Sequence, residues 1–256
     1  MKASTLSDAY LHALASLIRD KTGLVFPRSR QHDLEAGIHR AMTNSGAVDL
    51  DEFARLLETD ERLFDTLISD ITVAETYFFR EPAQFEVIRK EILPDLRRRQ
   101  SSDAQVRIWS AGCASGEEAY SLAILMEQEG LAAQSSILAT DISRASLARG
   151  REAVYGAWSL RDRVDGDLVQ FFQRHGDRFS LHDRLRRRVD FKYLNLAANG
   201  YPSPITGTTD IDLIVCRNVL IYFDRETVRL VARRLFESLR VGGWLITGPS
   251  DPPLWD

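Results

Sequence analysis

The sequence predicts an α/β fold: a doubly wound, mostly parallel sheet, preceded by a small all-helical domain and carrying a small inserted antiparallel hairpin subdomain. Three observations support this class. From residue 104 onward, short apolar stretches of strand length alternate with helical patterns. A loop of small residues joins the first such stretch to a helix, as in open α/β sheets that bind ligands at their strand ends. Residues before position 72 show almost only helical spacing.

Length and composition narrow the class of protein. The 256 residues suffice for one large or two modest domains with a buried core. A net charge of -4, with 44% hydrophobic and 27% charged residues, is typical of a soluble globular protein and argues against nucleic-acid binding. No apolar run approaches the roughly 20 residues that cross a bilayer, and no signal-peptide pattern begins the chain. We therefore expect a cytoplasmic monomer without membrane insertion, and a further segment downstream of the last strand.

Residues 1–72 form the predicted helical domain. Two apolar stripes at helical spacing define its helices: Tyr10, Ala13, Leu14 and Leu17, then Phe53, Leu56, Leu57 and Phe64. Basic side chains lie between them: Arg28, Arg30, His39 and Arg40. This basic group has two interpretations, a solvated helix face or a docking face for an acidic partner helix.

Residues 73–103 form a linker motif and a helix. Three consecutive aromatic residues fit neither an exposed loop nor a simple amphipathic helix, so Phe78 and Phe79 are predicted core anchors. Arg80, directly beside them, is then held in place by packing. A charged helix follows over 83–99, with a kink expected at Pro94.

Residues 104–256 form the predicted sheet domain, which opens with a strand at 106–111. The Gly112–Gly116 loop can turn tightly and approach a ligand closely, although such a loop also occurs as a simple packing turn. Ser115 followed by Glu118 has capping-box spacing, so the helix is expected to begin there. Glu118 is therefore either part of the cap or a ligand-binding acid.

A second strand, 136–141, ends in Asp141. This acid follows the glycine loop at about the distance seen for carboxylates that bind ribose hydroxyls. Its alternative role is to cap the next helix. Ser143 can supply that cap, so the ribose role is favoured.

The inserted subdomain is expected over about residues 170–194. Stretches 179–182 and 189–194 each alternate as strands and are interpreted as a hairpin with an arginine-rich tip. The second stretch rejoins the main sheet and ends at Asn195. A buried strand at 211–216 then ends at Asn218, and an amphipathic helix (225–239) and a last strand follow.

Polar strand-end residues converge on one edge of such a sheet. The Gly112 loop, Asp141, Asn195 and Asn218 together offer a close approach, an acid for ribose and amides for an adenine edge. Cys113 and Cys216 are interpreted as reduced apolar residues rather than nucleophiles. The five histidines show no metal-ligand spacing, so no metal site is predicted.

Three blocks in order make the chain similar to the CheR-type chemotaxis receptor methyltransferases: TYFFRE (76–81), SAGCASGEE (110–118) and CRNVLIYFD (216–224). The resemblance covers nearly the whole chain. It implies a Rossmann-like methyltransferase domain and methyl transfer from S-adenosylmethionine to glutamate side chains on the cytoplasmic helical domain of chemoreceptors, with S-adenosylhomocysteine as product.

The resemblance also implies site residues. The cofactor contacts would be Thr76, Arg80, Glu118, Asp141, Asn195, Leu196, Asn218 and Val219. Arg80 and Tyr222 would flank the transferred methyl, although Tyr222 alone could equally be a half-buried aromatic. Ala74 departs from the family pattern, which has an asparagine there, and this puts one hydrogen bond in doubt.

Three rival functions remain open on the sequence. One is a methyltransferase for a signalling protein outside chemotaxis, and another is a non-catalytic module that senses S-adenosylmethionine. The third is a nicotinamide-dependent dehydrogenase, which the missing third glycine of the loop disfavours.

Overall fold

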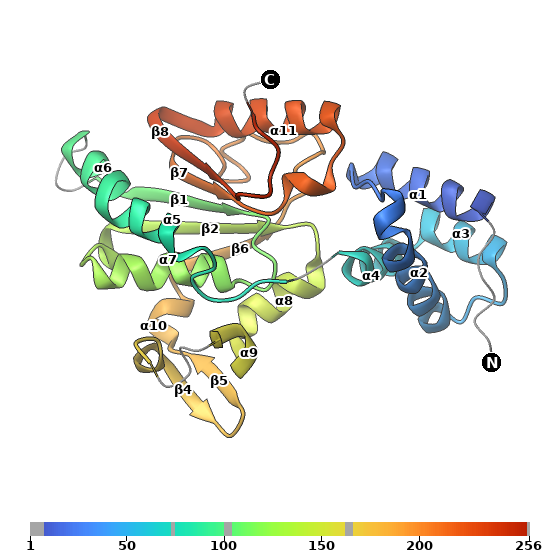
Figure 1. Cartoon of the computed structure of the whole chain (residues 1–256), viewed down its shortest axis with the longest axis horizontal. Coiled ribbons are helices and arrows are strands. Elements are labelled where there is room, and N and C mark those ends of the chain that lie inside the picture. The colour runs from blue at the N-terminus through green and yellow to red at the C-terminus, as the bar shows by residue number, and fades with distance from the viewer. Residues whose placement is uncertain (1–7, 73–74, 100–103, 162–165, 255–256) are drawn as a thin grey trace.

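The computed structural model describes residues 8–72, 75–99, 104–161 and 166–254. Ala74 therefore lies outside the described residues. A helical bundle packs beside a layered α/β domain, and a small three-stranded sheet projects from the α/β domain on another side (Figure 1). Within the described ranges, no helix is both long enough and apolar enough to span a membrane.

The helical bundle consists of five elements: α1 (Asp8–Thr22), the 3₁₀ turn η1 (Arg28–Arg30), α2 (Gln31–Ser45), α3 (Leu50–Thr59) and α4 (Glu61–Ile71). Side chains of Asp49 and Asp60 cap α3 and α4 by accepting backbone N–H groups. The predicted stripe of α3 is buried at Phe53 and Leu57. The stripe predicted for α1 is wrong at Ala13, which is exposed, because the buried face runs instead through Leu11, Leu14 and Ile18.

The main sheet has five parallel strands: β1 (Val106–Ala111), β2 (Ser135–Asp141), β6 (Val189–Tyr193), β7 (Ile211–Cys216) and β8 (Leu239–Thr247). Their order is β6-β2-β1-β7-β8, so the chain runs outward from β1 in one direction and then from β7 in the other. The strand order reverses between β1 and β7. In open α/β sheets, ligands bind outside the carboxyl ends of the strands at such a point.

Helices cover both faces of this sheet, which confirms the doubly wound prediction. One core lies between the sheet and the helices α5 (Pro82–Val87), α6 (Leu93–Arg99), α7 (Glu117–Gln128) and α8 (Arg144–Glu152). The core on the opposite face is closed by α11 (Arg225–Ser238). Alternating strand residues serve the two cores: Ile108 belongs to the first and Trp109 to the second.

The helix predicted for 83–99 is continuous but irregular. A π-helical turn, η2 (Ile88–Ile92), separates α5 from α6 immediately before Pro94. Proline has no N–H with which to complete the regular helical ladder, and a wider turn accommodates this loss. The disturbance expected at Pro94 thus appears as a π turn on its N-terminal side.

The projecting sheet corrects the predicted hairpin. It contains β3 (Val154–Gly156), β4 (Phe172–His175) and β5 (Arg178–Leu181) in the order β3-β5-β4. The hairpin therefore joins β4 to β5, and β6 pairs with β2 in the main sheet. The arginine-rich stretch is not a hairpin tip but the short helix α10 (Asp183–Arg186) and the turn after it, anchored by Arg184 to Glu127 on α7. The remaining short elements are η3 (Ala132–Gln134), α9 (Ala157–Leu160), η5 (Val169–Phe171) and η6 (Leu220–Tyr222).

Candidate active site

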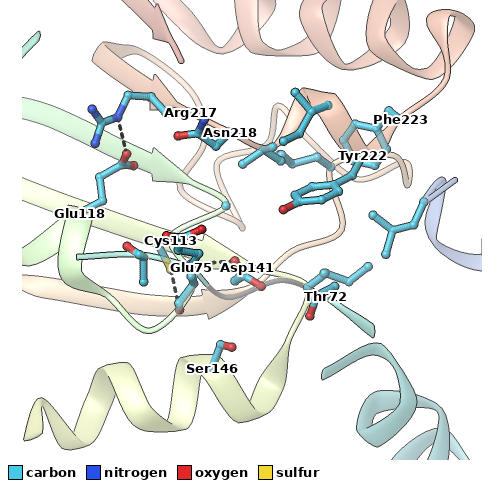
Figure 2. Close-up of a pocket in the computed structure, with 18 of the residues that line it drawn as sticks. Thr72, Glu75, Cys113, Glu118, Asp141, Ser146, Arg217, Asn218, Tyr222 and Phe223 are labelled. Carbon is cyan, nitrogen blue, oxygen red and sulfur yellow. Dashed lines mark hydrogen bonds and ion pairs between the residues drawn. The ribbon is translucent and has the colours of Figure 1, made fainter. Parts of the chain in front are cut away.

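One pocket of about 270 Å³ lies at the carboxyl ends of the central strands (Figure 2). Every site residue that the sequence predicts lines it: Thr76, Arg80, Gly112, Glu118, Asp141, Asn195, Leu196, Asn218, Val219 and Tyr222. These residues come from the linker, the strand ends, the first turn of α7 and the turn after β7. The fold thus brings the whole predicted set to a single cavity.

The loop between β1 and α7 lines the pocket with Gly112, Cys113 and Ala114. Gly112 has a φ of 83°, and a Cβ there would lie 2.3 Å from Cγ2 of Val219, so only glycine fits. Its N–H and that of Cys113 both donate to the carbonyl of Thr140 at the end of β2. Ala114 also has a positive φ, 47°, which is uncommon for a residue with a Cβ. The loop is therefore fixed in one tight conformation.

The predicted capping box is wrong. α7 begins at Glu117 with Gly116 as its N-cap, and no side chain caps it. Ser115 instead donates its hydroxyl to Oε2 of Glu117 at 2.8 Å. Gly116, with a φ of 94°, makes the turn into the helix, and this releases Glu118 from any capping role.

Glu118 forms a buried ion pair at the pocket wall. Its Oε2 accepts from Nε of Arg217 at 2.7 Å (Figure 2). Its Oε1 accepts from the Ser110 hydroxyl at 2.7 Å. Nη1 of Arg217 donates to the carbonyl of Arg80 at 2.6 Å and to Oε1 of Gln84 at 2.9 Å. A single guanidinium thus joins the Glu118 carboxylate to the backbone that carries Arg80.

Asp141 receives backbone N–H groups on both of its carboxylate oxygens. Ser143 N–H donates to Oδ1 and Ala114 N–H to Oδ2, each at 2.8 Å. Burial raises the pKa of Asp141, and these hydrogen bonds oppose the increase. The Ser143 hydroxyl caps α8 by accepting from Ser146 N–H. The remaining lone pairs of Asp141 can accept from hydroxyl groups in the pocket.

Arg80 is held by the segment around it. Phe78 and Phe79 are buried, as predicted. Their N–H groups donate to the carbonyl of Ser159 and the hydroxyl of Ser121. Phe79 and Glu81, on either side of Arg80, have φ values of 54° and 59°. Such conformations are strained for residues with side chains and concentrate at functional sites. The segment places the Arg80 side chain at the pocket.

Tyr222, in the turn η6, borders the pocket where the helical bundle docks. Val25 N–H donates to the Tyr222 carbonyl at 2.9 Å, and the Arg30 guanidinium lies 4.5 Å from the centre of the tyrosine ring. Burial raises the pKa of the phenol, although the charges of Arg30 and Arg80 oppose the increase. The hydroxyl is therefore protonated at neutral pH and can donate a hydrogen bond. In Figure 2 it points into the pocket.

The two asparagines differ in how far the protein already uses them. Asn195 donates to the carbonyl of Lys21 in the helical bundle at 3.1 Å and accepts from Ala197 N–H at 2.9 Å. Asn218 has a φ of 57°, which asparagine tolerates better than most residues. Its backbone N–H donates to Asp251, while no described residue hydrogen-bonds its side-chain amide. Asn218 is thus the better placed of the two to recognise a ligand edge.

Several residues of the site were missed by the sequence analysis. Arg217 and Glu75 line the pocket, as does Leu24 from the helical bundle. A charged residue directly after an apolar strand signals a buried partner, so Arg217 could have been found. Asp251, which accepts the N–H groups of residues 218, 219, 220 and 248, left no local signal.

The cysteines are buried and free, as expected. Burial raises the pKa of Cys113, which lines the pocket, and the neighbouring Asp141 and Glu118 charges raise it further. A neutral thiol is a poor nucleophile. Among the described residues, no group of three or more histidine, cysteine, aspartate or glutamate side chains is arranged to hold a metal.

S-adenosylmethionine suits the chemistry of this pocket. Asp141 can accept from the ribose hydroxyls, and the Asn218 amide can meet the edge of a base. Glu118 retains lone pairs for the ammonium group of the methionine part. Apolar side chains line the rest of the pocket and can enclose the adenine: Leu24, Ile142, Leu194, Leu196 and Val219.

Comparison with known proteins agrees with this chemistry. Residues 74–252 match the CheR methyltransferase SAM binding domain, and residues 9–72 match the CheR methyltransferase all-alpha domain. A chemotaxis protein methyltransferase from Borreliella burgdorferi is 31% identical over 94% of this chain and 87% of its own length. Those from Listeria innocua and Escherichia coli are 32% and 31% identical over 96% of this chain, and over 90% and 85% of their own lengths. Both domains match in order, and the chain therefore belongs to the CheR methyltransferase family, with S-adenosylmethionine as its cofactor.

Proposed function

We propose that this protein methylates glutamate side chains on the cytoplasmic helical domain of chemoreceptors, acting as a cytoplasmic monomer. The names of the relatives, chemotaxis protein methyltransferases, support this substrate class. The observation that carries the proposal is the presence of Arg80 and Tyr222 in one pocket with Asp141 and Glu118. A cation and a neutral hydroxyl suit a carboxylate acceptor beside a cofactor site.

The reaction needs little general acid or base catalysis from these residues. Glutamate is already ionised at neutral pH, so its oxygen can attack without a general base. The bound cofactor supplies a methyl group on a positively charged sulfur; as the oxygen–carbon bond forms, the carbon–sulfur bond breaks and its electrons remain on sulfur. Both charges are neutralised, and a water-poor pocket favours such a step.

Arg80 and Tyr222 align the acceptor in this proposal. The Arg80 guanidinium can hold the acceptor carboxylate in its plane, and the Tyr222 hydroxyl can donate one hydrogen bond to it. Too strong a hold on the attacking oxygen would lower its reactivity, so positioning is the expected contribution. Correct alignment of oxygen, carbon and sulfur can supply several kcal/mol of the rate acceleration, of the roughly 7–11 kcal/mol available in well-oriented systems.

Two substitutions test the assignment. Asp141→Ala is expected to weaken S-adenosylhomocysteine binding about tenfold or more, since hydrogen bonds to a charged group contribute about 1.5–3 kcal/mol. Tyr222→Phe should keep that affinity and slow methyl transfer by about tenfold. Calorimetric titration measures binding, and labelled methyl transfer to receptor-enriched membranes, with a base-labile product, measures turnover.

Other outcomes would point to the alternative functions. Binding without a base-labile product would favour a non-catalytic module. Transfer to other signalling proteins but not to receptors would favour a different acceptor. Wild-type affinity and turnover in both variants would remove the site assignment itself.

A further inference from the structure

A cluster of the half-buried Tyr77 and the exposed Trp158 and Arg161 lies beside the pocket; we call it the aromatic clamp. The Arg161 guanidinium lies 4.4 Å from the Tyr77 ring centre and 4.2 Å from the Trp158 ring centre. The two rings meet edge to face at 6.3 Å. Trp158 is nevertheless 50% exposed. Tryptophan, tyrosine and arginine are the residue types most enriched among the hot spots of protein interfaces.

The backbone holds Arg161 in this place under strain. Its φ is 53° and its ψ is -139°, a combination that residues with a Cβ rarely adopt. It follows α9 directly, and the α9 residue Ser159 accepts the N–H of Phe78 through its carbonyl. The clamp is therefore built on the same contact that fixes the Phe78–Arg80 segment.

Glu75 connects the clamp to the active site. It lines the pocket, and its backbone carbonyl accepts from Nη1 of Arg80 at 2.6 Å. Its side-chain Oε1 lies 3.6 Å from Nη2 of Arg161, and both side chains are well exposed. At this separation the pair is loose, so it contributes little and an incoming carboxylate can replace it. Glu75 marks a position where Arg161 accepts a carboxylate.

Tyr77 also links the two arginines. The Arg80 guanidinium lies 5.8 Å from the Tyr77 ring centre, and that of Arg161 lies 4.4 Å from it. One arginine serves the pocket, and the other faces solvent just outside it. On a helix, side chains three or four positions apart have Cβ atoms about 5–6 Å apart. Since both guanidinium groups lie near the same ring centre, they are at most about 10 Å apart, which is within two turns of a helix. A helical substrate with its acceptor glutamate at Arg80 can thus bring a second acid to Arg161.

We propose that the aromatic clamp recognises a second acidic side chain, one or two turns from the acceptor glutamate on the substrate helix. Arg161 pairs with that carboxylate in place of Glu75, and Trp158 packs against the helix. This inference rests on the proposed function, because it assumes a glutamate-bearing helix as the substrate. It adds a specificity determinant outside the cofactor pocket.

Charge reversal in the whole chain tests the clamp. Arg161→Glu and Trp158→Ala are each expected to raise KM for a soluble receptor cytoplasmic fragment about tenfold, with kcat and S-adenosylhomocysteine affinity within about twofold of wild type. Arg233→Glu is the matched control, since Arg233 is an exposed arginine on α11 that pairs with Glu237 of the same helix. It should leave KM unchanged.

A charge swap separates recognition from a structural role. Acidic residues of the fragment at three, four or seven positions from the methylated glutamate are changed to lysine one at a time. One of these changes should raise KM for the wild-type enzyme and restore KM for Arg161→Glu. If no change restores it, or if Arg161→Glu alters cofactor affinity instead of KM, the clamp proposal is overturned while the proposed function stands. If the wild-type enzyme transfers no methyl to the fragment, both are overturned.

Discussion

The two sides of the first turn of α7 carry adjacent glutamates in contrasting surroundings. Glu117 and Glu118 are both buried, with 3% and 9% of their surface exposed. Glu118 faces the cofactor pocket and pairs with the Arg217 guanidinium. Glu117 faces the small sheet and accepts hydrogen bonds from the hydroxyl groups of Ser115 and Ser159, while the charge of Arg149 acts on it from a greater distance. One carboxylate is balanced by a buried cation, whereas the other relies on neutral donors.

The two glutamates stabilise different contacts around the site. On the Glu118 side, Arg217 extends the ion pair to the carbonyl of Arg80 and so joins the cofactor wall to the acceptor-binding segment. On the Glu117 side, Ser159 holds the carboxylate by its hydroxyl and the Phe78 N–H by its carbonyl. Burial raises the pKa of Glu117, and the two serine hydrogen bonds oppose the increase. Both glutamates thus help to hold the Phe78–Arg80 segment, Glu118 through an ion pair and Glu117 through hydrogen bonds from neutral hydroxyl groups.

The largest effect is expected on the Glu118 side. Arg217→Met leaves Glu118 buried without its cation, and breaking a buried pair from one side typically lowers stability by about 3–5 kcal/mol. Urea unfolding measures this loss. Arg217→Lys should lose less, because the charge remains while the planar fork that reaches the Arg80 carbonyl is absent.

A double substitution provides the control. Glu118→Gln combined with Arg217→Met removes both charges, so much of the stability lost in Arg217→Met should return. If Arg217→Met unfolds at the same urea concentration as wild type, the ion pair between Arg217 and Glu118 contributes nothing to stability. The proposed contrast between Glu118 and Glu117 would then be wrong.

The Glu117 side is expected to respond in the opposite direction. Because the folded chain raises the pKa of Glu117, it binds that proton more tightly than the unfolded chain does. Stability therefore falls as pH rises from the ordinary glutamate pKa through the raised one, and the full penalty persists above it. Glu117→Gln lacks this penalty. At pH 7 it should therefore be at least as stable as wild type.

Unfolding across this pH window measures the effect as a difference between variant and wild type. The free energy of unfolding of Glu117→Gln should increase relative to that of wild type as pH rises. The difference should become constant above the raised pKa of Glu117. Glu118→Gln is the matched substitution and should be destabilising, since it leaves Arg217 unpaired. A wild-type advantage that grows with pH would contradict the assignment of Glu117 as an acid whose pKa is raised by burial.

Residues at the strand ends and at the start of α7 show what the sequence could and could not predict. Parallel strands bring their carboxyl ends to one edge, so Asp141 and Asn218 could be placed in one pocket from their order alone. Capping-box spacing assigned Ser115 to Glu118, but the helix begins one residue later and Ser115 meets Glu117. A shift of one residue exchanges the roles of neighbouring side chains, and spacing does not resolve it.

Contacts between residues that are far apart in the sequence were the second feature that the sequence could not predict. Arg217 meets a carboxylate 99 residues earlier in the chain, so no local pattern identifies the pair. Leu24 of the helical bundle lines the pocket, and the Lys21 carbonyl accepts from Asn195; both contacts depend on how the bundle docks against the α/β domain. Periodicity predicted each domain but not the contact between them.

The smallest effect concerns a single hydroxyl on the Glu117 side. Ser159→Ala removes the 3.0 Å hydrogen bond to Oε1 of Glu117 and keeps the carbonyl that accepts from Phe78. A hydrogen bond to a carboxylate is stronger than one to its protonated form, so the loss should be about 1 kcal/mol at neutral pH and smaller once Glu117 is protonated. In a Glu117→Gln background the loss should likewise shrink, and S-adenosylhomocysteine affinity, which depends on the Glu118 side, should stay the same. A loss independent of pH and background would mean that Ser159 stabilises the loop through its packing rather than through the carboxylate, and the contrast between the two glutamates would then rest on Arg217 alone.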